Sequence, residues 1–192
     1  DDTVDATVSA TTDTLLTGMT LTPGAGTYLL VFSTSADNSV TGIQLFHSVY
    51  VNNILVAHTE RIVWAEASIS ANLGAMSCLI AAKVTPAAGQ TVEIRSRRVT
   101  NNWTVHERTL TLMKVADADI KEATATADQA GTNTTYALLN SMTIADPGAA
   151  DWLAIFSTSQ IYGTIAANNT TTYSLFNAGT QDTESERAMT HG

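Results

Sequence analysis

The sequence predicts an all-β fold: an antiparallel jelly-roll sandwich, with one complete copy followed by the first half of a second tandem copy. Three observations predict it. Apolar and polar residues alternate with a period of two, turn residues divide the chain at short intervals, and a block near the N-terminus reappears in the second half. Hydrophobic residues make up 44% of the 192-residue chain, enough to bury a sandwich core.

Seven strands are predicted in the first copy, and turn residues such as Pro23-Gly24 and Asn101-Asn102 separate them. The strands are expected near 15–22, 27–35, 40–51, 54–63, 76–84, 90–99 and 103–115. The Ala-rich residues 64–75 allow either a loop or a short helical turn. No helix is required to account for the pattern.

Internal repetition follows the same order as the predicted strands. The repeated blocks are 15–21 (LLTGMTL) with 138–144 (LLNSMTI), 28–35 (YLLVFSTS) with 152–159 (WLAIFSTS), and Glu60-Arg61 with Glu186-Arg187. Because the matches keep their order along the chain, we interpret them as two copies of one unit.

The repeat sets the expected domain boundaries. We expect a jelly-roll domain over residues 5–115, and a linker with a partial jelly-roll domain over residues 116–192. The second copy shows no counterpart to residues 64–115. Half a sandwich leaves strand edges and apolar faces in water. We therefore expect either unseen residues or strands of another chain to complete it.

The charge of the chain is low in density and uneven. Charged residues make up 14% of the chain, against about 25% in ordinary soluble domains. Residues 5–115 hold seven acidic and seven basic side chains, so the net charge of −9 comes mainly from residues 116–192. Duplex nucleic acid requires clustered basic charge, and a bilayer requires about 20 consecutive apolar residues. We expect neither nucleic acid nor a membrane as a partner.

The order of elements resembles the C1q/TNF-like jelly-roll family. The resemblance covers residues 5–115 and is carried by a leading strand, residues 26–32 (GTYLLVF), a hairpin with an Asn-rich turn, residues 88–94 (AGQTVEI) and the final 110–112 strand. It implies a homotrimer, because members of that family pack around a threefold axis. Tandem jelly rolls rich in Thr and Ala also resemble phage tail-fibre, tail-tip and capsid-decoration proteins.

The resemblance implies a non-enzymatic structural protein at a virion surface, acting by assembly and attachment. Its expected partners are other virion proteins or a host-surface glycan. The alternative is a secreted or cell-surface adhesin domain, extracellular in location, that binds glycan.

The Asn52-Asn53 turn gives the most specific local prediction. Two adjacent Asn residues tolerate the positive φ angles of a tight hairpin turn, which sets Val51 opposite Ile54 and His47 opposite His58. The two imidazoles would then have Cβ atoms about 5 Å apart, close enough to share a metal ion. We interpret the pair first as the cap of a core stripe, because no third ligand is evident, and expect no metal or other cofactor.

Candidate binding residues gather on the last two predicted strands of the first copy. Alternation places Arg95 and Arg97 on one face and Arg98 on the other. Together with Arg108 they are expected to form an inter-subunit ion-pair network or a solvated face, or else to anchor a carboxylate, a phosphate or an acidic glycan. Trp103 could stack on a sugar, although a buried Trp at a hairpin end is the more common arrangement.

Catalytic motifs are absent from the sequence. It contains no G-x-S-x-G, H-E-x-x-H, C-x-x-C or G-x-x-x-x-G-K-[ST] motif. The four histidines, at positions 47, 58, 106 and 191, do not form the close His-x-His cluster of a cupin. We therefore expect no catalytic residue and no enzyme.

Overall fold

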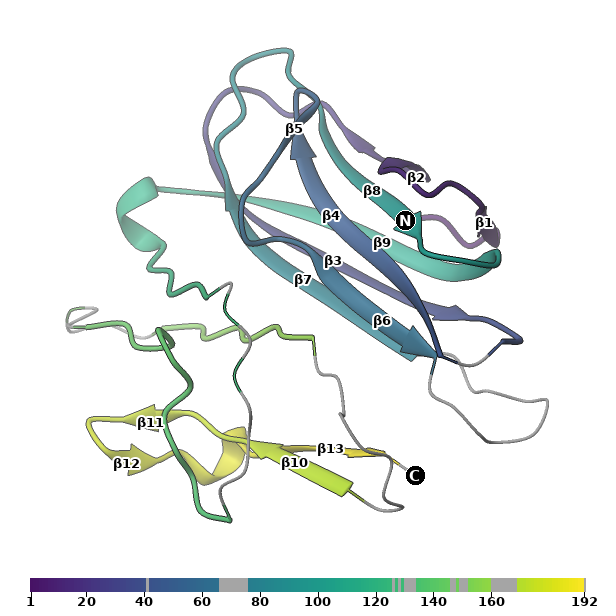
Figure 1. Ribbon diagram of the computed structural model, residues 1–192. Helices are drawn as coiled ribbons and strands as arrows, with labels where there is room; N and C mark the ends of the chain where they lie inside the picture. The colour runs from purple at the N-terminus through teal and green to yellow at the C-terminus, as the bar shows by residue number, and fades with distance from the viewer. Residues whose placement is uncertain are drawn as a thin grey trace. The chain divides into compact units, whose positions relative to one another are not determined.

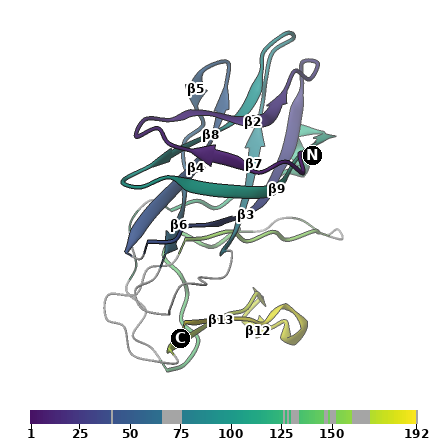
Figure 2. The same ribbon diagram turned by 90° about the vertical axis from the view of Figure 1, so that its right-hand side faces the viewer.

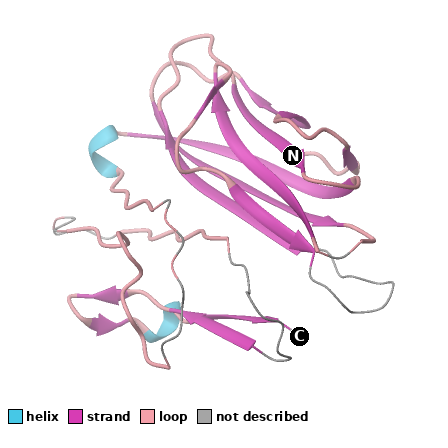
Figure 3. Cartoon of the chain, viewed as in Figure 1, coloured by secondary structure: helices cyan, strands magenta, loops and turns pink. Residues whose placement is uncertain are grey.

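The structure, a computed structural model, describes residues 1–40, 42–65, 76–125, 127, 129, 134–145, 148, 152–159 and 169–191. Within these residues the chain is all-β, with strands, loops and two short 3-10 turns, η1 (Asp117–Asp119) and η2 (Thr183–Ser185), as Figure 3 shows. No helix in this part of the chain has the length and apolar character needed to cross a membrane.

The chain divides into two compact units. The first comprises Asp1–Glu122 with Asp146–Gln160, and the second comprises Ala123–Ala145 with Ile161–Gly192. The strands of the first unit are β1 (Ala6–Val8), β2 (Thr14–Leu21), β3 (Thr27–Asp37), β4 (Ile43–Val51), β5 (Ile54–Leu55), β6 (Arg61–Ala65), β7 (Met76–Val84), β8 (Val92–Arg98) and β9 (Trp103–Val115).

The first unit consists of two antiparallel sheets. One has the strand order β1-β9-β3-β7, and the other has the order β2-β8-β4-β5, with β6 also paired to β4. Figures 1 and 2 show β3, β7 and β9 on one side and β2, β4 and β8 on the other. The prediction of an antiparallel all-β fold is therefore confirmed, and the seven predicted strand regions of the first copy all contain strands.

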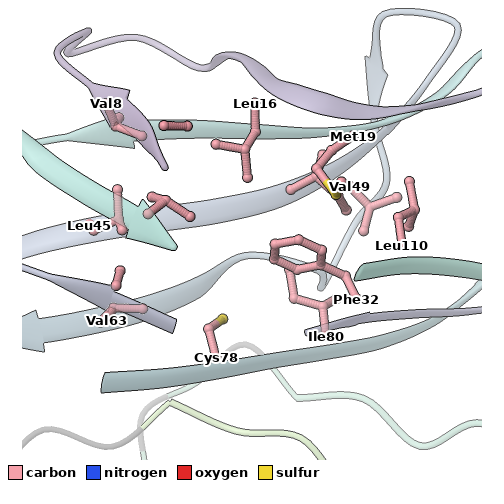
Figure 4. Packing of buried hydrophobic residues seen from close by; sticks show 14 of the residues in the cluster. Val8, Leu16, Met19, Phe32, Leu45, Val49, Val63, Cys78, Ile80 and Leu110 are labelled. Carbon is pink, nitrogen blue, oxygen red and sulfur yellow. The ribbon is translucent and has the colours of Figure 1, made fainter. Parts of the chain in front are cut away.

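A hydrophobic core fills the space between these sheets, as Figure 4 shows. It forms because alternate residues of each strand point inward, which the burial pattern of β3 follows along its length. The core side chains without exposed surface include Leu30, Phe32, Leu45, Val49, Ile80 and Ile94. Cys78 lies in the same core as a free thiol, and burial raises its pKa to about 12.

The strand predicted over residues 54–63 is interrupted, which is a correction to the sequence analysis. Its two parts are β5, which ends at Leu55, and β6, which begins at Arg61. Between them, Thr59 Oγ1 donates to the Val56 carbonyl at 2.7 Å and accepts from the Val49 amide at 3.0 Å. A side-chain hydroxyl thus takes the place of a backbone partner, so the chain turns before pairing with β4 resumes.

The N-terminal strand β1 was not predicted, and Arg108 accounts for its position. This guanidinium is 2% exposed. Its Nη2 pairs with Asp2 Oδ2 at 2.6 Å, Nη1 donates to the Val4 carbonyl at 2.8 Å, and Nε donates to the Thr17 carbonyl at 2.8 Å. The N-terminus is therefore fixed by a residue more than 100 positions away in sequence, which no local pattern reveals.

The sequence repeat is not reproduced as a structural repeat. Residues 28–35 lie in β3, between β7 and β9, whereas residues 152–159 form no strand. Instead, the Ser157 and Ser159 hydroxyls accept hydrogen bonds from Arg61 Nη2 at 2.9 Å and from the Ile62 amide at 2.7 Å.

The second unit contains two small antiparallel sheets. Strand β10 (Asn169–Tyr173) pairs with β13 (Arg187–His191), and β11 (Phe176–Asn177) pairs with β12 (Thr180–Gln181). These strands are much shorter than those of the first unit. The tandem jelly-roll copy expected over residues 116–192 is therefore not confirmed.

We predict that Arg108→Met destabilises the fold by about 3 kcal/mol, because it removes the buried guanidinium that pairs with Asp2 and donates to the carbonyls of Val4 and Thr17. Lys114→Met removes the same charge from an exposed position of the same strand and should change stability by about 0.5 kcal/mol or less. Urea denaturation of both variants measures the difference. Equal effects would contradict the anchoring role of Arg108.

Candidate functional site

The candidate site lies on the solvent side of the β4–β8 strand pair. Phe46, Ser48 and Tyr50 of β4 face away from the core, as do Glu93, Arg95 and Arg97 of β8, because residues of alternate parity point to opposite faces of a sheet. The register pairs Phe46 with Arg97, Ser48 with Arg95 and Tyr50 with Glu93. We call these six residues the outer β4–β8 face.

Both arginines of this face stack on aromatic rings of the neighbouring strand. The Arg97 guanidinium carbon lies 3.7 Å from the centre of the Phe46 ring, and that of Arg95 lies 4.5 Å from the centre of the Tyr50 ring. Each such contact contributes about 0.5–1 kcal/mol at an exposed site. The stacking keeps the two guanidinium planes in fixed orientations on a rigid pair of strands.

Carboxylates surround the two guanidinium groups. Arg97 pairs with Glu60 Oε2 at 2.6 Å through Nη2 and with Asp13 Oδ1 at 3.3 Å through Nε. Arg95 pairs with Glu93 Oε2 at 2.7 Å through Nη2. These ion pairs all lie within one chain, so the expected pairing of Arg95 and Arg97 between subunits stays a prediction.

Hydrogen bonds complete the network around the same carboxylates. The Tyr50 hydroxyl donates to Asp13 Oδ2 at 2.6 Å, and this bond, with burial and the charge of Asp13, raises the pKa of the Tyr50 phenol. The Thr91 hydroxyl donates to Glu93 Oε1 at 2.9 Å, and Arg95 Nη2 also donates to Asn53. The carboxylates are therefore held in place by neutral donors as well as by arginine.

Ser48 is the exception to this pairing. Its side chain is fully buried, and its Oγ has no hydrogen-bond partner among the residues that the structure describes. It lies between Phe46 and Tyr50 along β4 and opposite Arg95. A buried hydroxyl without a partner costs about 1–3 kcal/mol, and because Ser48 has no exposed surface, a ligand could reach it only if a neighbouring side chain moved.

The remaining predicted binding residues lie elsewhere. Arg108 is buried under the N-terminal segment, as described above, and is not available to a ligand. Trp103 is fully buried and pairs with Val8 of β1, so it cannot stack on a sugar in solvent. Of the four residues proposed from the sequence, the structure brings together Arg95 and Arg97 alone.

The predicted cross-strand pairing of His47 with His58 is wrong. Val51 does face Ile54 as expected, but the turn at Thr59 then places Arg61, not His58, opposite His47. His58 is exposed, with φ of 63°. In the described part of the chain, no three His, Cys, Asp or Glu side chains are grouped so that they could hold a metal ion.

His47 belongs to the core. Its Nδ1 lies 2.8 Å from Ser96 Oγ, and its ring meets the edge of Phe32 with the centroids 5.5 Å apart. Nε2 has no hydrogen-bond partner among the described residues. Burial lowers the pKa of His47 to about 3, so the imidazole is neutral throughout the physiological range.

The sequence analysis missed five contributors to this site: Asp13, Phe46, Ser48, Tyr50 and Glu60. Three of them could have been identified from the alternation of residues along the sequence. Once Val49 and Val51 are assigned to the core face, alternation places Phe46, Ser48 and Tyr50 on the opposite face. Asp13 and Glu60 lie outside the two central strands, and only the folded structure brings them to the guanidinium groups.

We predict that His47 makes the fold less stable as the pH falls. The unfolded chain takes up a proton near pH 6.5, whereas the folded chain does so only near pH 3. Stability should therefore drop by about 2 kcal/mol between pH 7 and pH 5 on account of this residue alone.

Urea denaturation of the wild type, His47→Leu and His58→Leu at both pH values measures this contribution. His106 remains in all three proteins; its hydrogen bond to Asp5 raises its pKa and gives an opposing trend that cancels in the comparison. Only His47→Leu should lose the acid-induced drop. An unchanged drop in His47→Leu would show that His47 is not a buried neutral residue.

Comparisons with known proteins give limited information. No known protein family and no curated protein matches this sequence. Among solved structures, the C-terminal domain of EclA, described as a sugar-binding protein, is similar over 58% of this chain and 79% of that chain, with 9% sequence identity and a TM-score of 0.38. A similarity at this level supports no conclusion about the ligand of this chain.

Proposed function

We propose that this chain is a non-catalytic attachment module that binds glycan through the outer β4–β8 face. The observation that carries the proposal is the pair of guanidinium groups of Arg95 and Arg97, each stacked on an aromatic ring and paired with carboxylates on the same face of two adjacent strands. Sugar hydroxyl groups both donate and accept hydrogen bonds. This face offers guanidinium donors and carboxylate acceptors within one connected network, so it can satisfy both.

The position of the face in the fold supports binding. β4 and β8 are adjacent strands inside the five-stranded sheet, and each has a neighbour on its other side. Side chains on such strands are held more accurately than side chains on loops. Because the guanidinium groups are already ordered by stacking and ion pairing, a ligand has little side-chain entropy to overcome on binding.

The non-catalytic part of the proposal is supported by the placement of His47 and Ser96. Their contact has the geometry of a base beside a hydroxyl nucleophile. Both side chains are buried in the core, however, and a substrate could not approach them without separating the sheets. The carboxylates of the outer β4–β8 face are engaged by arginine, which suits recognition better than proton transfer.

Assembly into a virion structure as a homotrimer stays a second proposal, together with the jelly-roll connectivity and the tandem copy. One observation favours assembly. The solvent side of the other sheet carries apolar residues from three adjacent strands, with Leu29 opposite Met113 and Val31 opposite Ala81. Leu79 and Met113 are exposed there. A surface of this kind is suited to packing against another protein chain.

We predict that the purified chain binds oligosaccharides on a glycan array, and that Arg97→Ala reduces the affinity about tenfold or more. Arg98→Ala is the matched control, because it removes the same charge from the neighbouring position, where the guanidinium donates to the Ser9 carbonyl. Circular dichroism establishes that both variants fold. Absence of binding by the wild type, or equal losses in both variants, would contradict the proposed function.

A further inference from the structure

We infer that the ligand of the outer β4–β8 face is a neutral glycan, without carboxylate, sulfate or phosphate groups. This inference rests on the proposed function and narrows its ligand class. It follows from the excess of negative charge at the site, from the carboxylates that already pair with each guanidinium group, and from the neutral hydroxyl of Ser48.

The site carries more negative charge than positive charge. Two guanidinium groups, those of Arg95 and Arg97, are in contact with three carboxylates, those of Asp13, Glu60 and Glu93. Arg108, which would have added a third cation, is buried on the other sheet. With one carboxylate in excess, the face repels an approaching anion at short range.

An anionic ligand would also have to compete with carboxylates that already occupy the guanidinium donors. Arg95 uses Nε and Nη2 on Glu93, at 3.0 and 2.7 Å. The Glu93 side chain is 11% exposed, so displacing it would leave a nearly buried carboxylate without its cation, which is strongly unfavourable. The arginines thus have N–H groups left that can donate hydrogen bonds to a ligand, but carboxylates already balance their positive charge.

Ser48 Oγ and Asp13 Oδ1 are the buried side-chain atoms of this site without a hydrogen-bond partner among the described residues. Asp13 Oδ1 is paired with the Arg97 guanidinium at 3.3 Å, whereas the Ser48 hydroxyl is neutral. Ser48 Oγ can donate one hydrogen bond and accept others, and it lies between the stacked guanidinium groups. A neutral sugar hydroxyl could donate to Glu60, whose side chain is 41% exposed, and accept from Arg97 beside it. Paired donors and acceptors of this kind match the adjacent hydroxyl groups of a sugar ring.

The test uses pairs of oligosaccharides that differ only by one acidic group: each neutral compound with its sialylated, uronate or sulfated counterpart. Affinities of the full chain are measured at about 50 and about 500 mM NaCl, because screening weakens interactions between charges. We expect binding of neutral compounds, a change of less than about twofold between the two salt concentrations, and roughly tenfold weaker binding of the acidic counterparts.

Glu60→Gln tests the role of the excess carboxylate. It should reduce the difference in binding affinity between acidic and neutral compounds. Glu107→Gln, the same change at an exposed position of β9, should leave that difference unchanged. If acidic compounds bind more tightly than neutral ones and salt weakens that binding, the ligand class is wrong while the proposed function stands. If neither class binds, the proposed function is wrong and this inference with it.

Discussion

The antiparallel register between β4 and β8 determines both the core and the candidate site. It places His47 against Ser96 and Val49 against Ile94 on the inner face, and Phe46 against Arg97 and Ser48 against Arg95 on the outer face. A shift of one residue in either strand would move that strand's charged and apolar residues to the wrong sides. The register is therefore strongly specified, because it has to bury an apolar stripe and expose a charged one at the same time.

The two faces of this strand pair hold their ionisable side chains in opposite charge states, neutral on the inner face and charged on the outer face. On the inner face the imidazole of His47 stays neutral, because burial lowers its pKa to about 3. On the outer face two cations are retained, but each is matched by carboxylates and stacked on a ring. The result is a surface rich in hydrogen-bonding groups and poor in net positive charge. This balance of charges is the basis for the proposal that the face prefers neutral polar ligands to anions.

The sequence predicts the strands well and the site only in part. Alternation and turn residues locate the strands of the first copy, and they place Arg95 and Arg97 together on one face. The pairing of His47 with His58 fails because it assumes a regular hairpin, whereas the hydroxyl of Thr59 bonds the backbone and turns the chain. From the sequence alone Arg108 is expected at the surface, because its partners in the structure, Asp2 and two carbonyls, come from distant parts of the chain. Residues 152–159 repeat the sequence of residues 28–35 but form no strand, so a similar local sequence does not by itself produce the same structure.

The central claim is that the outer β4–β8 face is the binding surface. Amide chemical-shift mapping by NMR, with the tightest neutral oligosaccharide of the array added to the labelled chain, tests it most directly. The account predicts that the largest shifts occur at Phe46, Ser48, Tyr50, Arg95 and Arg97. Shifts concentrated on the solvent side of the other sheet, around Leu29, Leu79 and Met113, or the lack of any saturable shift, would contradict it.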